Sequence, residues 1–282
     1  MSTMLASARQ RDILARLRRE GAVRVPDLAA RYGVSDMTIR RDLEALEAQG
    51  TARKVHGGAV LPERSAEDVG FQRKRELAGS AKTAIARRAA QMVAPGDSVA
   101  LSAGTTTWYL ARLLADVDGL TALTNSPNVA EALHREEASD QQILLTGGLF
   151  RTPSDALTGP VAEASLAGLH VDVLFLGAHG LEPTAGATTP SLAEAQTNRA
   201  LIAHARRTVV VADHTKWGVV GLASFAPLSA IDLLITDDGL DEDARAEASE
   251  HIGEVLGVPA DEAPAPVPGA DHHDDRETHH EG

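Results

Sequence analysis

The sequence predicts a two-domain α/β protein in which a small, mainly helical N-terminal domain precedes a larger domain built on a parallel sheet. Before residue 50, apolar residues recur at helical spacing in three short segments, and two short extended segments follow. After residue 80, apolar extended segments alternate with helical ones, which is typical of a parallel sheet covered on both faces. The 282 residues are enough for two domains of ordinary size.

The composition excludes several classes of protein. Aromatic residues make up only 3% of the chain against 43% for all apolar residues, so aliphatic side chains must build the cores. The chain has no cysteine, which excludes disulfides and thiolate metal sites and fits a reducing compartment. No stretch approaches the roughly 20 apolar residues that cross a bilayer. Arg9, Arg11 and Arg16 interrupt any apolar core of a signal peptide, so we expect a cytoplasmic protein without a membrane partner.

The charge is distributed unevenly along the chain. Residues 1–64 hold 12 Lys and Arg against 8 Asp and Glu, whereas residues 65–262 hold 14 against 27. The overall net charge is −13, yet the N-terminal part is basic. This asymmetry favours a basic domain that approaches phosphates and an acidic domain that does not.

The N-terminal domain begins with two predicted helices. Residues 8–20 carry apolar side chains at helical spacing, and Pro26 is suited to the start of a second helix. Gly33 lies where the chain must turn tightly before a third helix. Residues 51–61 are predicted to form a two-stranded hairpin that turns near His56. The order helix, helix, turn, helix, hairpin is that of a winged helix-turn-helix.

The third helical segment, which starts with the run S-D-M-T-I-R-R-D-L at Ser35, carries the sharpest pattern. Ile39, Leu43 and Leu46 are predicted to pack inward, with Ser35 as the helix cap. The other side presents hydroxyl and guanidinium groups that can bond base edges and phosphates. Asp42 is expected to orient an arginine or to pair within the domain. Together with the hairpin, this predicts as DNA-binding residues Ser35, Met37, Thr38, Arg40, Arg41, Arg53, Lys54 and His56.

Composition also sets the predicted domain limits. Residues 1–61 form the winged helix-turn-helix domain, and the charged residues 62–80 form a linker that leads into a helix. Residues 81–258 form the α/β domain. Residues 259–282 contain almost nothing apolar, so they are predicted to be a disordered, acidic, His-containing tail.

The α/β domain is predicted from its alternating segments. Helices are expected over residues 80–93, 106–115, 127–135, 160–168 and 191–205. Strands are expected over residues 98–102, 120–124, 142–146, 171–176, 207–212 and 231–236. Small polar loops follow five of these strands, at residues 103–107, 124–126, 146–148, 177–180 and 213–216. Because ligands bind beyond the carboxyl ends of strands in open α/β sheets, these loops predict a binding site.

The first of these loops has the pattern of an anion site. Gly104 stands between a strand and a helix, and Thr105 and Thr106 follow it. Glycine lets a ligand approach the backbone, and the helix N-terminus offers free amides and the positive end of a dipole. Ordinary helix capping explains the same residues, so this loop alone does not decide between the two.

Residues 9–60 resemble the winged helix-turn-helix of the DeoR family, through the run at Ser35 and the later run R-K-V-H-G-G-A. The resemblance continues through the α/β domain. It implies a bacterial transcription regulator, usually a repressor, whose sensor domain binds a phosphorylated sugar. It also implies that the sensor domain is similar in fold to ribose-5-phosphate isomerase.

The resemblance also implies roles for individual residues. Phosphate would be held by Gly104, Thr105 and Thr106, the pocket would be lined by Asn125 and Gly148, and the sugar would face Glu194, Asp213 and Lys216. For Lys216 a plain surface position remains open, and Asp213 also fits the cap of a turn. No cofactor is implied, and the dispersed histidines do not predict a metal site.

Two departures from the family bear on activity. Ser102 and Ala103 stand where many members have an aspartate before the glycine. Residues 176–180 read L-G-A-H-G where the isomerases place catalytic aspartates. Isomerisation needs a carboxylate base over the reacting carbons, so we predict a regulator and not an enzyme. The alternatives are a phosphosugar isomerase-like enzyme with an accessory DNA-binding domain and a nucleoid-type protein that ignores ligands. A homo-oligomer is expected, since dimers usually read paired half-sites on DNA.

Overall fold

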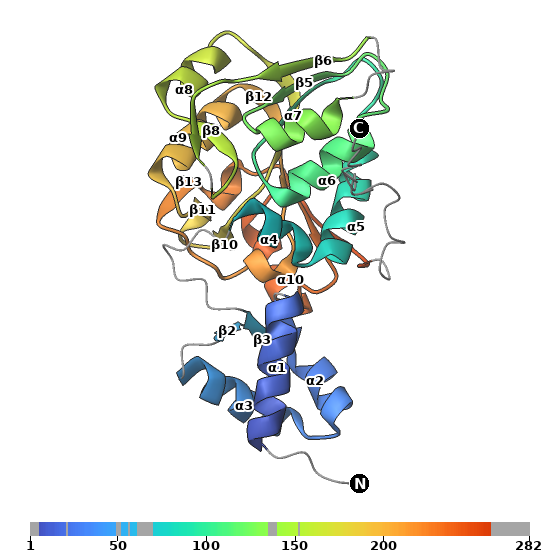
Figure 1. Cartoon of the computed structure of the whole chain (residues 1–282), viewed down its shortest axis with the longest axis vertical. Helices are drawn as coiled ribbons and strands as arrows, with labels where there is room; N and C mark the ends of the chain where they lie inside the picture. Colours follow the sequence, from blue (N-terminus) through green and yellow to red (C-terminus); the bar gives the residue numbers. More distant parts are fainter. Residues whose placement is uncertain are drawn as a thin grey trace, which may run out of the picture.

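The computed structural model describes residues 6–20, 22–48, 52–55, 57–60, 70–134, 140–151 and 153–260. Figure 1 shows two domains arranged end to end. Residues 6–60 form the smaller domain, here called the head, and residues 70–260 form the larger one, called the body. Within the described residues no helix is both long enough and apolar enough to cross a bilayer.

The head consists of three helices and a small antiparallel sheet. The helices are α1 (Ala6–Glu20), α2 (Val25–Tyr32) and α3 (Asp36–Ala48). The sheet has the order β1-β3-β2, formed by β1 (Ala22–Arg24), β2 (Arg53–Val55) and β3 (Gly58–Val60). The β2–β3 hairpin, called the wing below, was predicted. Strand β1 was not, because its three residues are too few to show an alternation.

The helices of the head enclose one aliphatic core, as the helical spacing predicted. Its main members are Ile13, Leu17, Val23, Val25, Leu28, Ile39, Leu43 and Leu46, all buried. Gly33 ends α2 in the left-handed region at φ 62°, and its amide bonds the carbonyl of Ala29. This conformation suits glycine because a side chain there would be strained. The turn between α2 and α3 therefore has the predicted residue and geometry.

The body is built on a seven-stranded sheet in which all neighbouring strands are parallel. Its order is β15-β14-β12-β9-β4-β5-β6. The strands are β4 (Ser98–Leu101), β5 (Thr121–Thr124), β6 (Gln142–Leu145), β9 (Val171–Leu176), β12 (Ala205–Val211), β14 (Leu233–Asp237) and β15 (Val255–Val258). Apart from β15, each of these strands was predicted within two residues at either end.

Helices cover both faces of this sheet. On one face lie α5 (Gly79–Ala90), α6 (Thr105–Leu114) and α7 (Pro127–Leu133), against side chains such as Val99, Phe175 and Val209. On the other lie α8 (Pro160–Leu166), α9 (Leu192–Ala203) and α10 (Glu242–His251), against side chains such as Leu174 and Val210. Adjacent residues of a strand thus join opposite cores, which is why these strands are apolar throughout.

Several short elements were not predicted from the sequence. Strands β7 (Leu149–Arg151) and β8 (Ala156–Thr158) form a hairpin, and β10 (Gly180–Glu182), β11 (Gly186–Thr189) and β13 (Ala223–Ala226) form a third sheet. Each of these strands has three or four residues, too few for a periodic pattern. Helix α10 is largely polar, so its pattern was also missed.

The predicted linker and tail lie only partly within the described residues. Helix α4 (Phe71–Glu76) occupies part of the linker and is anchored by the buried Phe71. Residues 62–69 of the linker and residues 261–282 of the tail lie outside the described residues.

Candidate functional site

Helix α3 presents the outward face that its sequence predicted. Met37 is 61% exposed, and Arg40 and Arg41 are exposed beside it. Ser35 accepts a hydrogen bond from the amide of Thr38 at 3.3 Å, and the two hydroxyls lie 3.0 Å apart. Ser35 therefore caps the helix as predicted, and the two arginines remain directed to solvent, where DNA can reach them.

A buried ion pair fixes α3 to α1. The Arg9 Nε lies 2.5 Å from the Asp42 carboxylate, and both residues are at most 5% exposed. The Gln10 amide donates to the other Asp42 oxygen at 3.0 Å. The prediction that Asp42 pairs within its own domain is confirmed. The pair sets the position of the exposed arginines of α3 relative to the rest of the head.

The wing cations have partners within the protein. Lys54 donates to Glu44 of α3 at 2.9 Å, and this contact lowers the pKa of Glu44. Arg53 donates from Nη1 to the carbonyl of Gly218 in the body at 3.1 Å. His56, which was also predicted to bind DNA, lies outside the described residues. The wing thus contacts both α3 and the body.

The predicted effector loops meet at one edge of the large sheet. Strands β12, β9, β4, β5 and β6 are consecutive neighbours and run parallel, so their carboxyl ends lie side by side. These ends carry residues 213–216, 177–180, 104–106, 125–126 and 147–148 in that order. Most of the residues predicted to bind the effector are therefore brought to the same edge by the sheet order.

The loop after β4 leads into a helix whose first residues, Thr105 and Thr106, are buried. Helix α6 begins at Thr105, and its cap residue Gly104 has no side chain to bond the first amides. These amides are the ones that lack partners within a helix. The Ser102 hydroxyl accepts from the amide of Gly177 at 3.0 Å, so it joins this loop to the one after β9. Ser102, one of the two residues where the resemblance leads us to expect an aspartate, thus braces two neighbouring loops.

Asn125 and Gly148 shape the neighbouring part of the edge. Asn125 is buried, accepts from the Ala103 amide at 2.8 Å and donates to the Leu157 carbonyl at 3.1 Å. Gly148 has φ 117°, and a Cβ added there would meet the Thr158 carbonyl at 2.7 Å. Both residues hold the β7–β8 hairpin against the strand ends.

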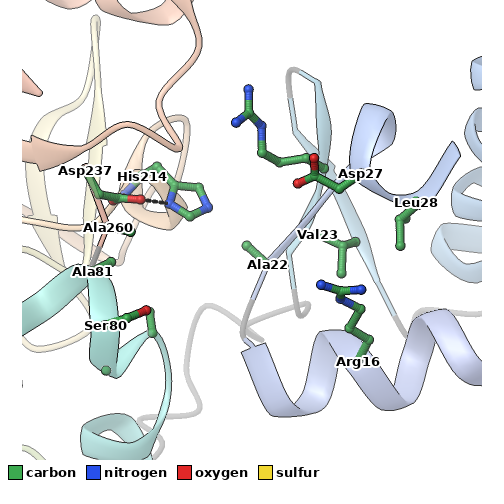
Figure 2. A pocket seen from close by; sticks show the side chains of 13 residues that line it. Arg16, Ala22, Val23, Asp27, Leu28, Ser80, Ala81, His214, Asp237 and Ala260 are labelled. Atoms are coloured by element: carbon green, nitrogen blue, oxygen red, sulfur yellow. Dashed lines mark hydrogen bonds and ion pairs between the residues drawn. The ribbon is translucent and has the colours of Figure 1, made fainter. Parts of the chain in front are cut away.

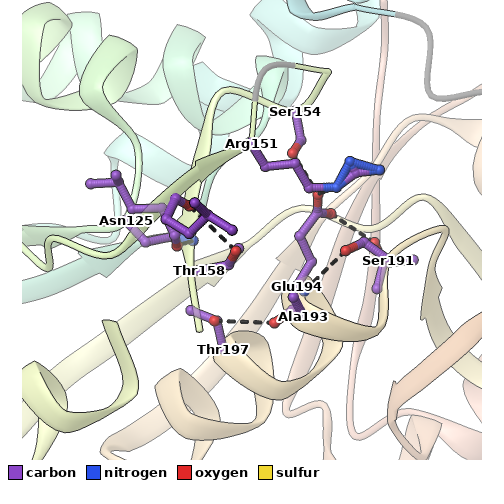
Figure 3. A network of polar contacts seen from close by, with 11 residues as sticks. Asn125, Arg151, Ser154, Thr158, Ser191, Ala193, Glu194 and Thr197 are labelled. Atoms are coloured by element: carbon purple, nitrogen blue, oxygen red, sulfur yellow. Dashed lines mark hydrogen bonds and ion pairs between the residues drawn. The ribbon is translucent and has the colours of Figure 1, made fainter. Parts of the chain in front are cut away.

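Glu194 is the centre of a polar network that the sequence did not predict (Figure 3). Its carboxylate accepts from the hydroxyls of Ser154 at 2.5 Å and Thr189 at 2.8 Å. Arg151 Nε lies 3.2 Å from the same group, and Ser191 caps the helix that carries Glu194. Arg151 lies on the β7–β8 hairpin, which can approach the strand ends because Gly148 has no side chain. In the sequence, Arg151 is marked only by its position shortly after the loop T-G-G.

Asp213 is a buried carboxylate among cations. Burial alone raises its pKa, but the charges of Lys216, Lys82 and His214 outweigh burial and lower the pKa to about 2. The Thr215 hydroxyl also donates to it. Asp213 therefore remains ionised, and it caps the turn that carries Lys216, so the turn-cap reading applies to this residue.

Lys82 is a second buried cation that sequence reasoning missed. It is 4% exposed, and its ammonium donates to the carbonyls of Lys74 at 2.5 Å and Leu77 at 2.6 Å. The first carbonyl belongs to α4 and the second to the short connection between α4 and α5. The lysine therefore connects the start of the body to the loop that carries Asp213.

His214 bonds Asp237 at the carboxyl end of β14 and faces the head (Figure 2). Its Nδ1 lies 2.6 Å from Asp237 Oδ2. Burial lowers the pKa of His214, but the hydrogen bond and the charge of Asp237 outweigh it, so the pKa is raised. A cleft of about 390 Å³ separates this histidine from Ala22, Val23 and other residues of the head.

Both parts of the chain match known families. Residues 9–65 match the DeoR-like helix-turn-helix domain, and residues 78–238 match the DeoR C terminal sensor domain. The regulator GlpR of Haloferax volcanii is 38% identical over 86% of this chain and 94% of its own. The glycerol-3-phosphate regulon repressor of Escherichia coli is 30% identical, over 83% of this chain and 92% of its own.

Another relative and one solved structure extend the comparison. The transcriptional repressor AccR of Agrobacterium fabrum is 34% identical over 82% of this chain and 89% of its own. A D-ribose-5-phosphate isomerase in complex with phospho-erythronic acid superposes with a TM-score of 0.35 and 17% identity, over 48% of this chain and 52% of that chain.

Proposed function

We propose that this chain, which belongs to the DeoR family of transcription regulators, represses genes of sugar or carbohydrate metabolism and is controlled by a phosphorylated sugar bound to its body. The head would read operator DNA in the cytoplasm, and the body would sense the metabolite. Relatives named as repressors, one of them of a glycerol-3-phosphate regulon, support this direction of control.

The convergence of five strand-end loops beside a helix start that no side chain caps carries the effector proposal. The protein has a net charge of −13, so an anion needs local compensation. The first amides of α6 supply a positive dipole end, and Lys216 supplies a full charge on the same edge. Glu194 and its hydroxyl partners supply acceptors and donors suited to a polyol. A phosphorylated sugar combines both chemical features.

The proposed domain limits follow from these two functions, DNA binding and effector binding. Residues 1–61 bind DNA, residues 62–80 link the domains, residues 81–258 bind the effector and residues 259–282 form the tail. These limits rest on composition; α4 and the first two residues of α5, which fall within this linker, are part of the body as described above.

The effector proposal is tested by titrating sugar phosphates into operator binding. A duplex that the parent protein selects from a random pool serves as the operator. The panel is glycerol 3-phosphate, ribose 5-phosphate, glucose 6-phosphate and fructose 6-phosphate, with their unphosphorylated parents. Thr105→Ala and Lys216→Ala should each weaken binding of the effective compound. Thr105→Ala should leave operator affinity without the compound unchanged, because Thr105 lies in the body and outside the loop of Lys216, whose neighbour Gly218 bonds Arg53 of the head. If the unphosphorylated compounds act equally well, the phosphate site is wrong.

The DNA proposal is tested on α3. Arg40→Ala and Arg41→Ala each remove an exposed guanidinium from the outward face. A lost base contact costs about 1–3 kcal/mol and relaxes specificity at one position, whereas a lost phosphate contact weakens all sequences alike. Operator binding equal to the parent in both variants would exclude α3 as the recognition helix.

A homo-oligomer is part of the proposal, since paired half-sites on DNA are read by paired heads. Exposed apolar side chains gather on the neighbouring elements β7, α8 and the start of α9. They are Leu149, Phe150, Val161 and Leu192, and Leu149 is 76% exposed. Apolar surface of this kind marks contact surfaces, and we assign it to a second copy of the chain.

A further inference from the structure

The wing rests on the loop that carries two of the candidate effector residues. Residues 213–218, called the coupling loop below, follow β12 and include Asp213 and Lys216. The carbonyl of Gly218, two residues after Lys216, accepts the hydrogen bond from Arg53 of the wing at 3.1 Å. One short segment thus contributes to the strand-end edge and also contacts the DNA-binding domain.

A second residue of the coupling loop also faces the head. His214 lies between the buried Asp213 and Thr215, and it lines the cleft opposite Ala22 and Val23 of β1 (Figure 2). Its bond to Asp237 fixes the direction of the imidazole. Successive residues of the loop therefore point in different directions, one toward the cations of the body and the next toward the head.

The turn of the wing contacts the body close to the same loop. A smaller cleft of about 150 Å³ is lined by wing residues, by Trp217 and by the start of α10. A Cβ added at Gly57 would lie 3.1 Å from the carboxylate of Asp241. The hydrogen bond of Arg53 is thus part of a wider contact between wing and body.

The coupling loop is hydrogen bonded as one unit. The Lys216 amide donates to the Asp213 carbonyl at 3.0 Å, and the Gly218 amide donates to the Leu181 carbonyl at 2.7 Å. Trp217 pairs with Leu181 in a β-bridge. Only Trp217 stands between Lys216 and Gly218, so the lysine and the carbonyl that holds Arg53 belong to one short hydrogen-bonded segment.

We propose that the coupling loop is the docking surface of the wing, and that Arg53 is the positioning residue through which the body controls DNA affinity. The inference rests on the proposed function, because it takes Lys216 to contact the effector. Occupancy at Lys216 shifts the Gly218 carbonyl, which changes how the wing is held and hence the orientation of the head. Control of this kind requires that the effector interact differently with the two positions of the loop.

The first test needs neither an operator nor an effector. Hydrogen exchange of the full chain is compared between the parent, Arg53→Ala and the matched wing variant Lys54→Ala. Lys54 pairs with Glu44 inside the head, so its removal should leave residues 214–222 unchanged. Arg53→Ala should raise exchange there several-fold, although these residues lie far away in the sequence. Equal exchange in parent and Arg53→Ala would overturn the docking surface.

The second test measures coupling. Operator affinity is determined with and without the most effective sugar phosphate of the panel, and the ratio of the two affinities is compared between variants. Typical coupling corresponds to a ratio of about 5 to 150. Arg53→Ala should bring the ratio close to 1 and leave direct binding of the sugar phosphate unchanged. If Arg53 serves only as a DNA contact, both affinities fall by the same factor and the ratio persists, which would refute the inference.

The two proposals fail in different ways. If no sugar phosphate changes the operator affinity of the parent, the proposed effector is wrong. Hydrogen exchange of the amides of residues 214–222 still decides whether Arg53 holds the wing on the coupling loop.

Discussion

The buried ion pair between α1 and α3 should control both the stability of the head and its affinity for DNA. Asp42→Ala removes the carboxylate 2.5 Å from Arg9, and both residues are at most 5% exposed. The buried arginine then loses the counter-charge of Asp42, and Gln10 loses its acceptor. Breaking a buried pair by removing one partner costs about 3–5 kcal/mol.

This cost is large for a small domain. Every 1.4 kcal/mol is a factor of ten, so about 3 kcal/mol raises the open fraction of the head by roughly 100-fold. We expect this increase in hydrogen exchange of the α3 amides in the full chain, together with weaker operator binding. The exposed Asp36 on the same helix provides the control. Asp36→Ala loses only a favourable interaction with the helix dipole, worth about 0.3–1 kcal/mol.

A compensated variant separates the ion pair from general disruption. Replacing Arg9 by Met and Asp42 by Leu together removes both buried charges. Well-packed apolar residues in place of a buried pair are often neutral or stabilising. The double variant should therefore exchange at close to the parent rate. If Asp42→Ala costs less than about 1 kcal/mol, or the double variant is no better, the pair does not anchor the recognition helix.

Three further predictions address the body. Gly148→Ala should abolish effector binding, because the new Cβ would lie 2.7 Å from the Thr158 carbonyl and the backbone of residue 148 has a φ of 117°. Calorimetry with the effective sugar phosphate measures this loss. His214 should titrate above its ordinary pKa in an NMR titration, and Asp237→Asn should lower that pKa. The raised pKa stabilises the folded body fully below about pH 6.5, and this stabilisation is lost as the pH rises through the raised value. Leu149→Asp should reduce the molar mass in light scattering, and an unchanged mass would place the contact between copies elsewhere.

The sequence predicted the family, the fold class and a regulator rather than an enzyme, and the comparisons confirm all three. The parallel strands were predictable because each is apolar along its whole length, since both faces are covered. Helix α3 was predictable because a cap, an apolar stripe and exposed arginines occur together in one short run. These are local patterns, and each is complete within a few residues.

The parts that were missed depend on contacts between distant segments. Arg151 and Glu194 lie on different elements, and only the folding of the β7–β8 hairpin brings them together. Lys82 reads as an ordinary polar position of an amphipathic helix, and only the structure shows its ammonium buried beside backbone carbonyls. Arg53 was predicted as a DNA contact from its charge. Its bond to Gly218, 165 residues away, has no counterpart in local sequence.

These contacts explain how a chain with an acidic body can still bind an anionic effector. An acidic body repels both DNA and phosphorylated ligands at long range. At the strand-end edge, however, Lys82 and Lys216 lie near the ionised Asp213 and keep cationic groups fixed at short range. A ligand phosphate would compete with Asp213 for Lys216, which gives the effector a way to loosen the coupling loop. Since the same loop holds Arg53, the electrostatics that favour an anion at this edge also act on the position of the wing.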